Sequence, residues 1–315
     1  MEGAMTDPAS PIGILYIASH SRSGSTLVGS VLGLVEGYVY VGEIREVWRD
    51  GLIDNQICGC GQKFRDCPFW TEVFNRAFGG FDTPETAAAT RRINAMPQWP
   101  QTLSWLRLAW VFPKGHGAPA ASTDPLAALY AAIREVSKAY VIVDSSKTMR
   151  YASLLAATPG IEFRMLNLIR DPRAIVQSRA NQARYRDGSL KPAAADYGNY
   201  RVFRIVAKWA LRNWLAGRVI GRDGGTRLLY EDFVKDQRPA LAAIAGPEKA
   251  DAAIAMLARG IPPDFFQHQI AGNWVRGLRI EPKDSWRDKL PWFPRTLAGV
   301  LSAPFRWRYR SSPGA

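Results

Sequence analysis

Residues 14–27 read ILYIASHSRSGSTL, and this stretch decides the fold that the rest of the chain supports. Its first half is apolar and rich in strand-favouring residues, which predicts a buried strand over about 12–18. After a short polar segment, apolar residues recur at helical spacing from Thr26 to Leu34. The stretch therefore predicts a strand, a tight loop and the start of a helix, in that order.

The loop between this strand and helix carries groups suited to an anion. Gly24 lets the backbone approach a ligand closely, and Ser23, Ser25 and Thr26 add hydroxyls to the N–H groups at the positive end of a helix. Arg22 precedes the glycine, whereas a Walker A loop has a lysine after its second glycine. We interpret the segment as a phosphate-binding loop of another kind; a tight turn without a ligand is the alternative.

A second unit of the same design lies at residues 166–178, which read LNLIRDPRAIVQS. A buried-type strand again ends in a charged turn, and Pro172 stands where the first turn of a helix is expected, since its missing N–H costs least there. The sequence thus predicts two strand–loop–helix units that end in cationic, hydroxyl-bearing turns.

Together these motifs resemble those of the sulfotransferases that use 3′-phosphoadenosine 5′-phosphosulfate (PAPS). The segment RSGSTL (22–27) is similar to their 5′-phosphosulfate loop, and RDPRAIVQS (170–178) is similar to their 3′-phosphate motif. The resemblance covers about residues 12–290 and includes four further segments: GE (42–43), DSSK (144–147), LYEDF (229–233) and GNWVRG (272–277). Trp274 departs from the family, whose late loop often has proline there.

The resemblance implies how the donor PAPS is bound. Arg22 would contact the 5′-phosphate and the bridging oxygen, and Ser23, Gly24, Ser25 and Thr26 would hold the remaining oxygens. Arg170 and Ser178 would bind the 3′-phosphate, an arrangement suited to a guanidinium fork and a hydroxyl. The further cofactor contacts that it implies are Tyr230, Asn273 and Arg276.

Sulfuryl transfer to a hydroxyl needs a base and cations rather than a metal. Glu43 is the expected base, because it follows a short strand and Gly42, in a segment similar to one that supplies the catalytic carboxylate in tyrosylprotein and some bacterial sulfotransferases. Lys147 is the expected second cation beside Arg22. The alternatives are a structural ion pair for Glu43, a solvated Lys147, and His20 as the base.

Two other functions stay open at this point. A nucleotide-dependent kinase would share the fold, with Asp144 as its candidate magnesium ligand, and a non-catalytic protein could retain the nucleotide pocket. The acceptor of a sulfotransferase could be a glycan, a glycolipid, a phenolic metabolite or a protein tyrosine, since all present a hydroxyl group.

Composition limits the class of protein. The 315 residues are 47% hydrophobic, enough for one large core, and the formal net charge is +13. No nucleic-acid-binding module or long basic tract accompanies this charge, so we expect no nucleic-acid partner and leave an acidic acceptor or an anionic membrane open. The first residues lack the pattern of a secretory signal and no long apolar run follows, which predicts a cytoplasmic protein.

The alternation of strands and helices predicts an α/β fold with a parallel, doubly wound sheet flanked by helices. Arg22, Asp144 and Arg170 each follow an expected strand, so one edge of the sheet would collect them. The expected strands cover about 12–18, 38–41, 140–143, 163–169 and 226–230; the expected helices cover about 26–34, 125–139, 149–157, 174–181, 197–218, 239–245 and 247–258.

A helical cap insertion is expected over about 58–120, with helices at 69–78, 83–94 and 103–111, and is the expected acceptor-binding region. All three cysteines, Cys58, Cys60 and Cys67, lie at its start. Their spacing is not a standard zinc pattern, and a fourth ligand would have to come from His20, His116, His268 or elsewhere. We therefore favour a metal-free clasp packed by Phe64, Phe69 and Trp70.

The chain closes with an aromatic and basic segment, 291–315, after the expected single domain over 12–290. It holds Trp292, Phe293, Phe305, Trp307 and Tyr309 among arginines. Packing onto the domain with the arginine heads in water is the simpler interpretation. Peripheral contact with an anionic membrane is the alternative, because aromatic and basic residues together favour such surfaces.

Overall fold

The computed structural model describes residues 10–95, 120–186, 197–260, 268–270, 280 and 285–310. Five parallel strands form one sheet with the spatial order β2-β3-β1-β4-β5. Ile14 on the central strand lies between Ile142 and Phe163 on its two neighbours. The strands are β1 (Ile12–Ser19), β2 (Tyr38–Tyr40), β3 (Val141–Asp144), β4 (Ile161–Ile169) and β5 (Gly225–Leu229).

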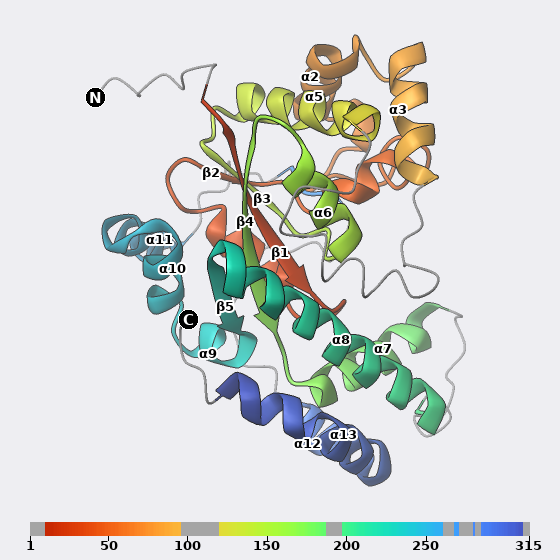
Figure 1. Cartoon of the computed structure of the whole chain (residues 1–315), viewed down its shortest axis with the longest axis vertical. Coiled ribbons are helices and arrows are strands. Elements are labelled where there is room, and N and C mark those ends of the chain that lie inside the picture. The colour runs from red at the N-terminus through yellow and green to blue at the C-terminus, as the bar shows by residue number, and fades with distance from the viewer. Residues whose placement is uncertain are drawn as a thin grey trace.

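Helices cover both faces of the sheet, which explains why β1 is buried at every position (Figure 1). Ile14 and Tyr16 face a core shared with α5 (Ala120–Ser137), α6 (Met149–Ala157) and α8 (Asn199–Asp223). Leu15 and Ile17 face a second core shared with α1 (Ser25–Leu32), α10 (Arg238–Ala245) and α11 (Pro247–Arg259). The predicted parallel α/β architecture is confirmed.

The boundaries differ from the predicted ones where loop chemistry intervenes. Helix α7 (Pro172–Arg186) begins at the proline itself and runs past the predicted end at 181. Tyr230 opens a short helix, α9 (Tyr230–Lys235), instead of ending strand β5. The 3₁₀ segment Ile44–Trp48, which follows Glu43, was not expected from the sequence.

Part of the predicted insertion forms a helical layer at one end of the molecule. Helices α2 (Pro68–Phe78) and α3 (Pro84–Asn94) lie beside α5 (Figure 1). The rings of Trp48, Phe64 and Phe74 join this layer to the core, with ring centroids 5.9–6.1 Å apart for the pairs that involve Phe74. The expected helix 103–111 lies outside the described residues.

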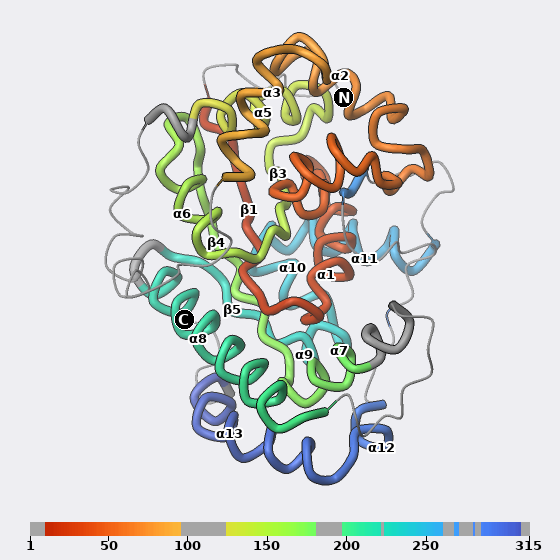
Figure 2. The backbone as a smooth tube through the Cα atoms, turned by 90° about the vertical axis from the view of Figure 1, so that its right-hand side faces the viewer, coloured from red at the N-terminus to blue at the C-terminus, as the bar shows by residue number. Residues whose placement is uncertain are grey.

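The C-terminal segment lies at the opposite end, as helices α12 (Trp286–Lys289) and α13 (Trp292–Arg310) (Figure 2). Tyr309 and Phe305 pack edge-on against the buried Trp209 of α8. Trp292 and Trp307, on the same helix, are 75% and 76% exposed. Packing onto the domain therefore explains the positions of Phe305 and Tyr309 but not the exposure of Trp292 and Trp307. Among the helices of the described residues, none is both long and apolar enough to cross a membrane.

Candidate functional site

The loop after β1 makes a sharp left-handed turn before α1. Arg22 and Gly24 have φ values of 72° and 88°. A Cβ atom at position 24 would come within 2.1 Å of the Tyr230 ring, so glycine is required both by the dihedral and by the close approach. The turn aims the first backbone N–H groups of α1 at the end of the sheet.

The two cationic motifs meet at this turn. The Nε of Arg22 donates a 2.8 Å hydrogen bond to Oγ of Ser178 on α7, and Nη1 of Arg170 donates a 3.0 Å bond to the carbonyl oxygen of Arg22. The Arg170 guanidinium lies 4.4 Å from the centre of the Tyr230 ring. Four of the residues expected to bind the donor thus form one cluster.

Serine hydroxyl groups of the loop after β1 are shielded from solvent. Ser23 and Ser25 are buried, and Oγ of Ser23 has no hydrogen-bond partner among the described residues. Thr26 is half-buried. A buried hydroxyl without a partner costs free energy, so its position beside two arginines suits a ligand that accepts hydrogen bonds.

Three further cations lie close to this cluster and were not assigned from the sequence. Arg179 of α7 and Lys208 and Arg212 of α8 have lowered pKa values, because burial and neighbouring positive charges disfavour their charged forms; the pKa of Arg212 falls to about 10. The same causes lower the pKa of Arg22. Like charges held together in this way favour a polyanionic ligand.

A sequence signal for the α8 cations exists. Arg204, Lys208 and Arg212 recur every four residues, which places them on one face of a helix. The direction in which that face points depends on how α8 crosses the sheet, and only the tertiary structure supplies this.

Glu43 and Lys147 form a second part of the site. Their side chains make an ion pair, and both are mostly buried. Gly42, with φ 84°, lets the chain turn against Ile270, whose carbonyl oxygen accepts a 2.9 Å bond from the N–H of Glu43. Lys147 itself has φ 65°. The expected base and the expected second cation are therefore brought together from the ends of β2 and β3.

Asp144 organises the loop that carries Lys147. Its carboxylate accepts hydrogen bonds from the N–H and Oγ of Ser146 at 2.8 and 2.6 Å, and from the Tyr130 hydroxyl at 2.5 Å. The N–H of Ile44 also points to it, at 3.4 Å. Both oxygens of this fully buried carboxylate are thus engaged by the protein, which leaves Asp144 poorly suited to bind magnesium.

His20 is packed beneath the loop. It is buried, its Nδ1 lies 2.8 Å from the carbonyl oxygen of Ser21, and burial together with the charge of Arg212 lowers its pKa to about 3. A neutral imidazole with so low a pKa is a weak proton acceptor near neutral pH. Glu43 is therefore the better candidate for the base.

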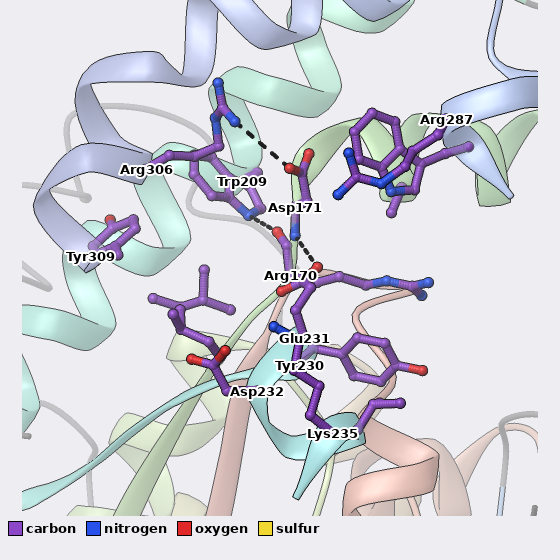
Figure 3. Close-up of a pocket in the computed structure, with 15 residues that line it drawn as sticks. Arg170, Asp171, Trp209, Tyr230, Glu231, Asp232, Lys235, Arg287, Arg306 and Tyr309 are labelled. Atoms are coloured by element: carbon purple, nitrogen blue, oxygen red, sulfur yellow. Dashed lines mark hydrogen bonds and ion pairs between the residues drawn. The ribbon is translucent and has the colours of Figure 1, made fainter. Parts of the chain in front are cut away.

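Arg170 also lines a cavity of about 460 Å³ (Figure 3). Its lining carries charges of both signs: Asp171, Glu231 and Asp232 are acidic, and Arg170, Lys235, Arg287 and Arg306 are basic. The Glu231 carboxylate accepts a 2.9 Å bond from the N–H of Asp171, and burial raises its pKa. The acidic and basic groups of this lining oppose one another, whereas positive charges gather at the loop of Arg22, so that loop suits phosphate groups better. Asn273 and Arg276 of the late loop, with Trp274, lie outside the described residues.

Comparison with known proteins identifies the fold. No protein-family profile and no curated protein matches the sequence. The sulfotransferase domain of the olefin synthase from Synechococcus PCC 7002 superposes with a TM-score of 0.51 and 18% identity, over 97% of this chain and 98% of that one. The sulfotransferase domain from the curacin biosynthetic pathway aligns with a TM-score of 0.49 and 15% identity, over 94% and 98%. This chain has the sulfotransferase fold, as its motifs predict.

The pKa of Asp144 predicts a pH dependence of stability. Burial raises this pKa from 3.8 to about 6, so between these values the folded protein binds more protons than the unfolded one and the free energy of unfolding falls as pH rises. We expect a loss of about 3 kcal/mol from pH 3.5 to 7, and Asp144→Asn should remove it. Urea unfolding of both proteins across this range measures the difference; parallel curves would contradict the prediction.

Proposed function

We propose that this protein is a sulfotransferase that moves a sulfuryl group from PAPS to a hydroxyl group. The observation that carries the proposal is the hydrogen bond between Arg22 and Ser178, which joins the 5′ and 3′ phosphate motifs that the sequence suggests. The sulfotransferase fold and the cluster of like charges around this bond support it.

Different residues of the cluster would bind different phosphate groups of PAPS. Arg22 and the loop from Ser23 to Thr26 would hold the 5′-phosphate, through one guanidinium, backbone N–H groups and hydroxyls. Arg170 and Ser178 would hold the 3′-phosphate. The Tyr230 ring, which already contacts the Arg170 guanidinium, would border the nucleoside.

Glu43 and Lys147 would act on the reacting groups, Glu43 as the base and Lys147 as a cation that stabilises negative charge. PAPS supplies the sulfuryl group: a bond forms between sulfur and the acceptor oxygen as the bond between sulfur and the phosphate oxygen breaks. Glu43 would take the acceptor's hydroxyl proton, while Lys147 and Arg22 would stabilise the negative charge left on the phosphate. Their ion pair places the carboxylate and the ammonium group side by side, where both can reach the reacting groups.

The engaged carboxylate of Asp144 weighs against the kinase alternative, because a magnesium ion would have to displace its three protein donors. A non-catalytic nucleotide-binding protein would share the anion site but would have no need for Glu43 beside Lys147. For the acceptor we propose a hydroxyl group on a glycan, glycolipid, phenol or protein tyrosine.

We expect 3′-phosphoadenosine 5′-phosphate to bind more tightly than magnesium-ATP in calorimetry. Arg170→Ala should weaken binding of the bisphosphate about 10- to 100-fold, because it removes charge-assisted hydrogen bonds. Arg259→Ala, at the exposed end of α11, is the control of equal charge change. Equal affinity in the Arg170 variant, or preference for magnesium-ATP, would contradict the proposed donor site.

Glu43→Gln should lower turnover about 100- to 10,000-fold, the range that general bases contribute. Turnover is measured as bisphosphate released from PAPS with whichever hydroxyl acceptor of a panel the wild type uses. Affinity for the bisphosphate should change little, since the phosphates contact other residues. Glu162→Gln, on an exposed part of β4, is the matched control. Near-normal turnover in the Glu43 variant would assign the base to another residue.

We also propose that α13 makes a peripheral contact with an anionic membrane. Trp292, Phe293, Val300 and Trp307 are exposed, and their spacing places all four within about 100° of one helix face. A surface of this kind, in a protein with net charge +13, suits an interfacial contact with anionic lipids.

Sedimentation with vesicles tests this contact. The wild type should sediment with vesicles that contain phosphatidylserine and much less with neutral vesicles, and added salt should reduce binding. Trp292→Ala combined with Trp307→Ala should lower the bound fraction, because the exposed aromatic surface is lost. Absence of salt-sensitive binding to anionic vesicles would remove the proposal.

A further inference from the structure

The three cysteines meet a histidine that is remote in the sequence. The donor atoms of Cys58, Cys60, Cys67 and His268 all lie within 4.8 Å of one another. Cys58 and Cys67 are buried, while Cys60 and His268 are partly buried. Cys67 and His268 are 201 positions apart, so the fold alone brings this set together.

Three of the distances between donor atoms are close to the edges of a tetrahedron around one metal ion. Sγ of Cys60 lies 3.6 Å from Sγ of Cys67, and Nδ1 of His268 lies 3.2 Å from Cys67 Sγ and 3.9 Å from Cys58 Sγ. Tetrahedral zinc with ordinary bond lengths separates such donor atoms by about 3.5–3.8 Å.

The backbone presents the three sulfurs on one side. The N–H of Cys58 donates to the carbonyl oxygen of Gln62, and Gly61, with φ 94°, donates to the carbonyl oxygen of Cys58. This tight turn carries Cys58 and Cys60. Cys67 directly precedes Pro68, the first residue of α2, so its position is set by the start of that helix.

His268 is held in place from several directions. Its ring stacks on Phe69 with a centroid distance of 4.6 Å and an interplanar angle of 7°. Trp70 Nε1 donates a 3.0 Å bond to the His268 carbonyl oxygen, and the N–H of Gly59 donates a 3.0 Å bond to that of Gln269. Contacts of this kind orient a metal ligand.

We propose that these four residues bind one zinc ion in a structural Cys₃His site. Three thiolates and a neutral imidazole are a usual ligand set for structural zinc, and four protein ligands leave no coordination position for a substrate. Binding would release the thiol protons and leave the site with one net negative charge. The spacing of the cysteines does not indicate a fourth ligand. The presence of His268 beside them favours a metal site over a metal-free clasp.

The ion would fix the strand-like segment that supports Glu43. Two residues after His268, the N–H of Ile270 donates a 3.0 Å bond to Val41, and its carbonyl oxygen accepts the 2.9 Å bond from Glu43. Zinc would therefore link the cysteine loop to the segment 268–270, whose backbone accepts the hydrogen bond from Glu43. The inference rests on the ligand geometry and is independent of the reaction proposed for Glu43.

The test uses the full chain purified without chelators. Elemental analysis of the wild type should find one zinc ion per chain, and a chromogenic chelator should detect its release when the thiols are titrated. Replacement by Co²⁺ should give thiolate charge-transfer absorption and the visible bands of a tetrahedral site. Cys67→Ser and His268→Ala should lose the metal, whereas His20→Ala should retain it.

These measurements need neither donor nor acceptor, so their failure is distinguishable from failure of the sulfotransferase proposal. If the variants do not fold, the wild-type metal content and cobalt spectrum decide alone. Zinc below stoichiometry with freely reactive thiols would overturn the site, as would a Cys60–Cys67 disulfide found by mass spectrometry. Full zinc content in folded His268→Ala would overturn the assigned ligand set.

Discussion

The hydrogen bond from Arg22 to Ser178 is the interaction on which the candidate site depends. It joins the loop after β1 to the helix after β4, and these strands are neighbours in a parallel sheet. Parallel pairing places both strand ends at one edge, where the guanidinium groups of Arg22 and Arg170 must share a small volume. Their mutual repulsion, reinforced by Arg179, favours a polyanionic ligand at this edge of the sheet.

The other half of the site is held by backbone hydrogen bonds together with the ion pair of Glu43 and Lys147. Glu43 follows a left-handed glycine and is bonded through its N–H to Ile270, while Asp144 uses its buried carboxylate to shape the loop of Lys147. Asp144 therefore has a positioning role. The proposed zinc site would extend this support outward, because His268 lies only two residues from Ile270 and in a different part of the chain from the cysteines.

Residues close to strand ends could be predicted from the sequence, and residues on long helices could not. Arg22 and Arg170 follow buried strands within a few positions and Asp144 ends one, so the parallel topology determines where they lie. Lys208 and Arg212 form an evident basic stripe, yet their place beside the anion site depends on the path of α8. His20 had two interpretations from its position, and burial decides between them.

The sequence by itself determined the parallel α/β fold, the loop proposed to bind an anion and the second cationic motif, because alternation, turn residues and strand-end cations are local properties. Only the tertiary structure decided that Glu43 pairs with Lys147, that Asp144 is fully engaged, and that His268 meets the three cysteines. The physical reason is distance along the chain: these contacts join segments whose approach depends on how whole elements pack, which no local pattern encodes.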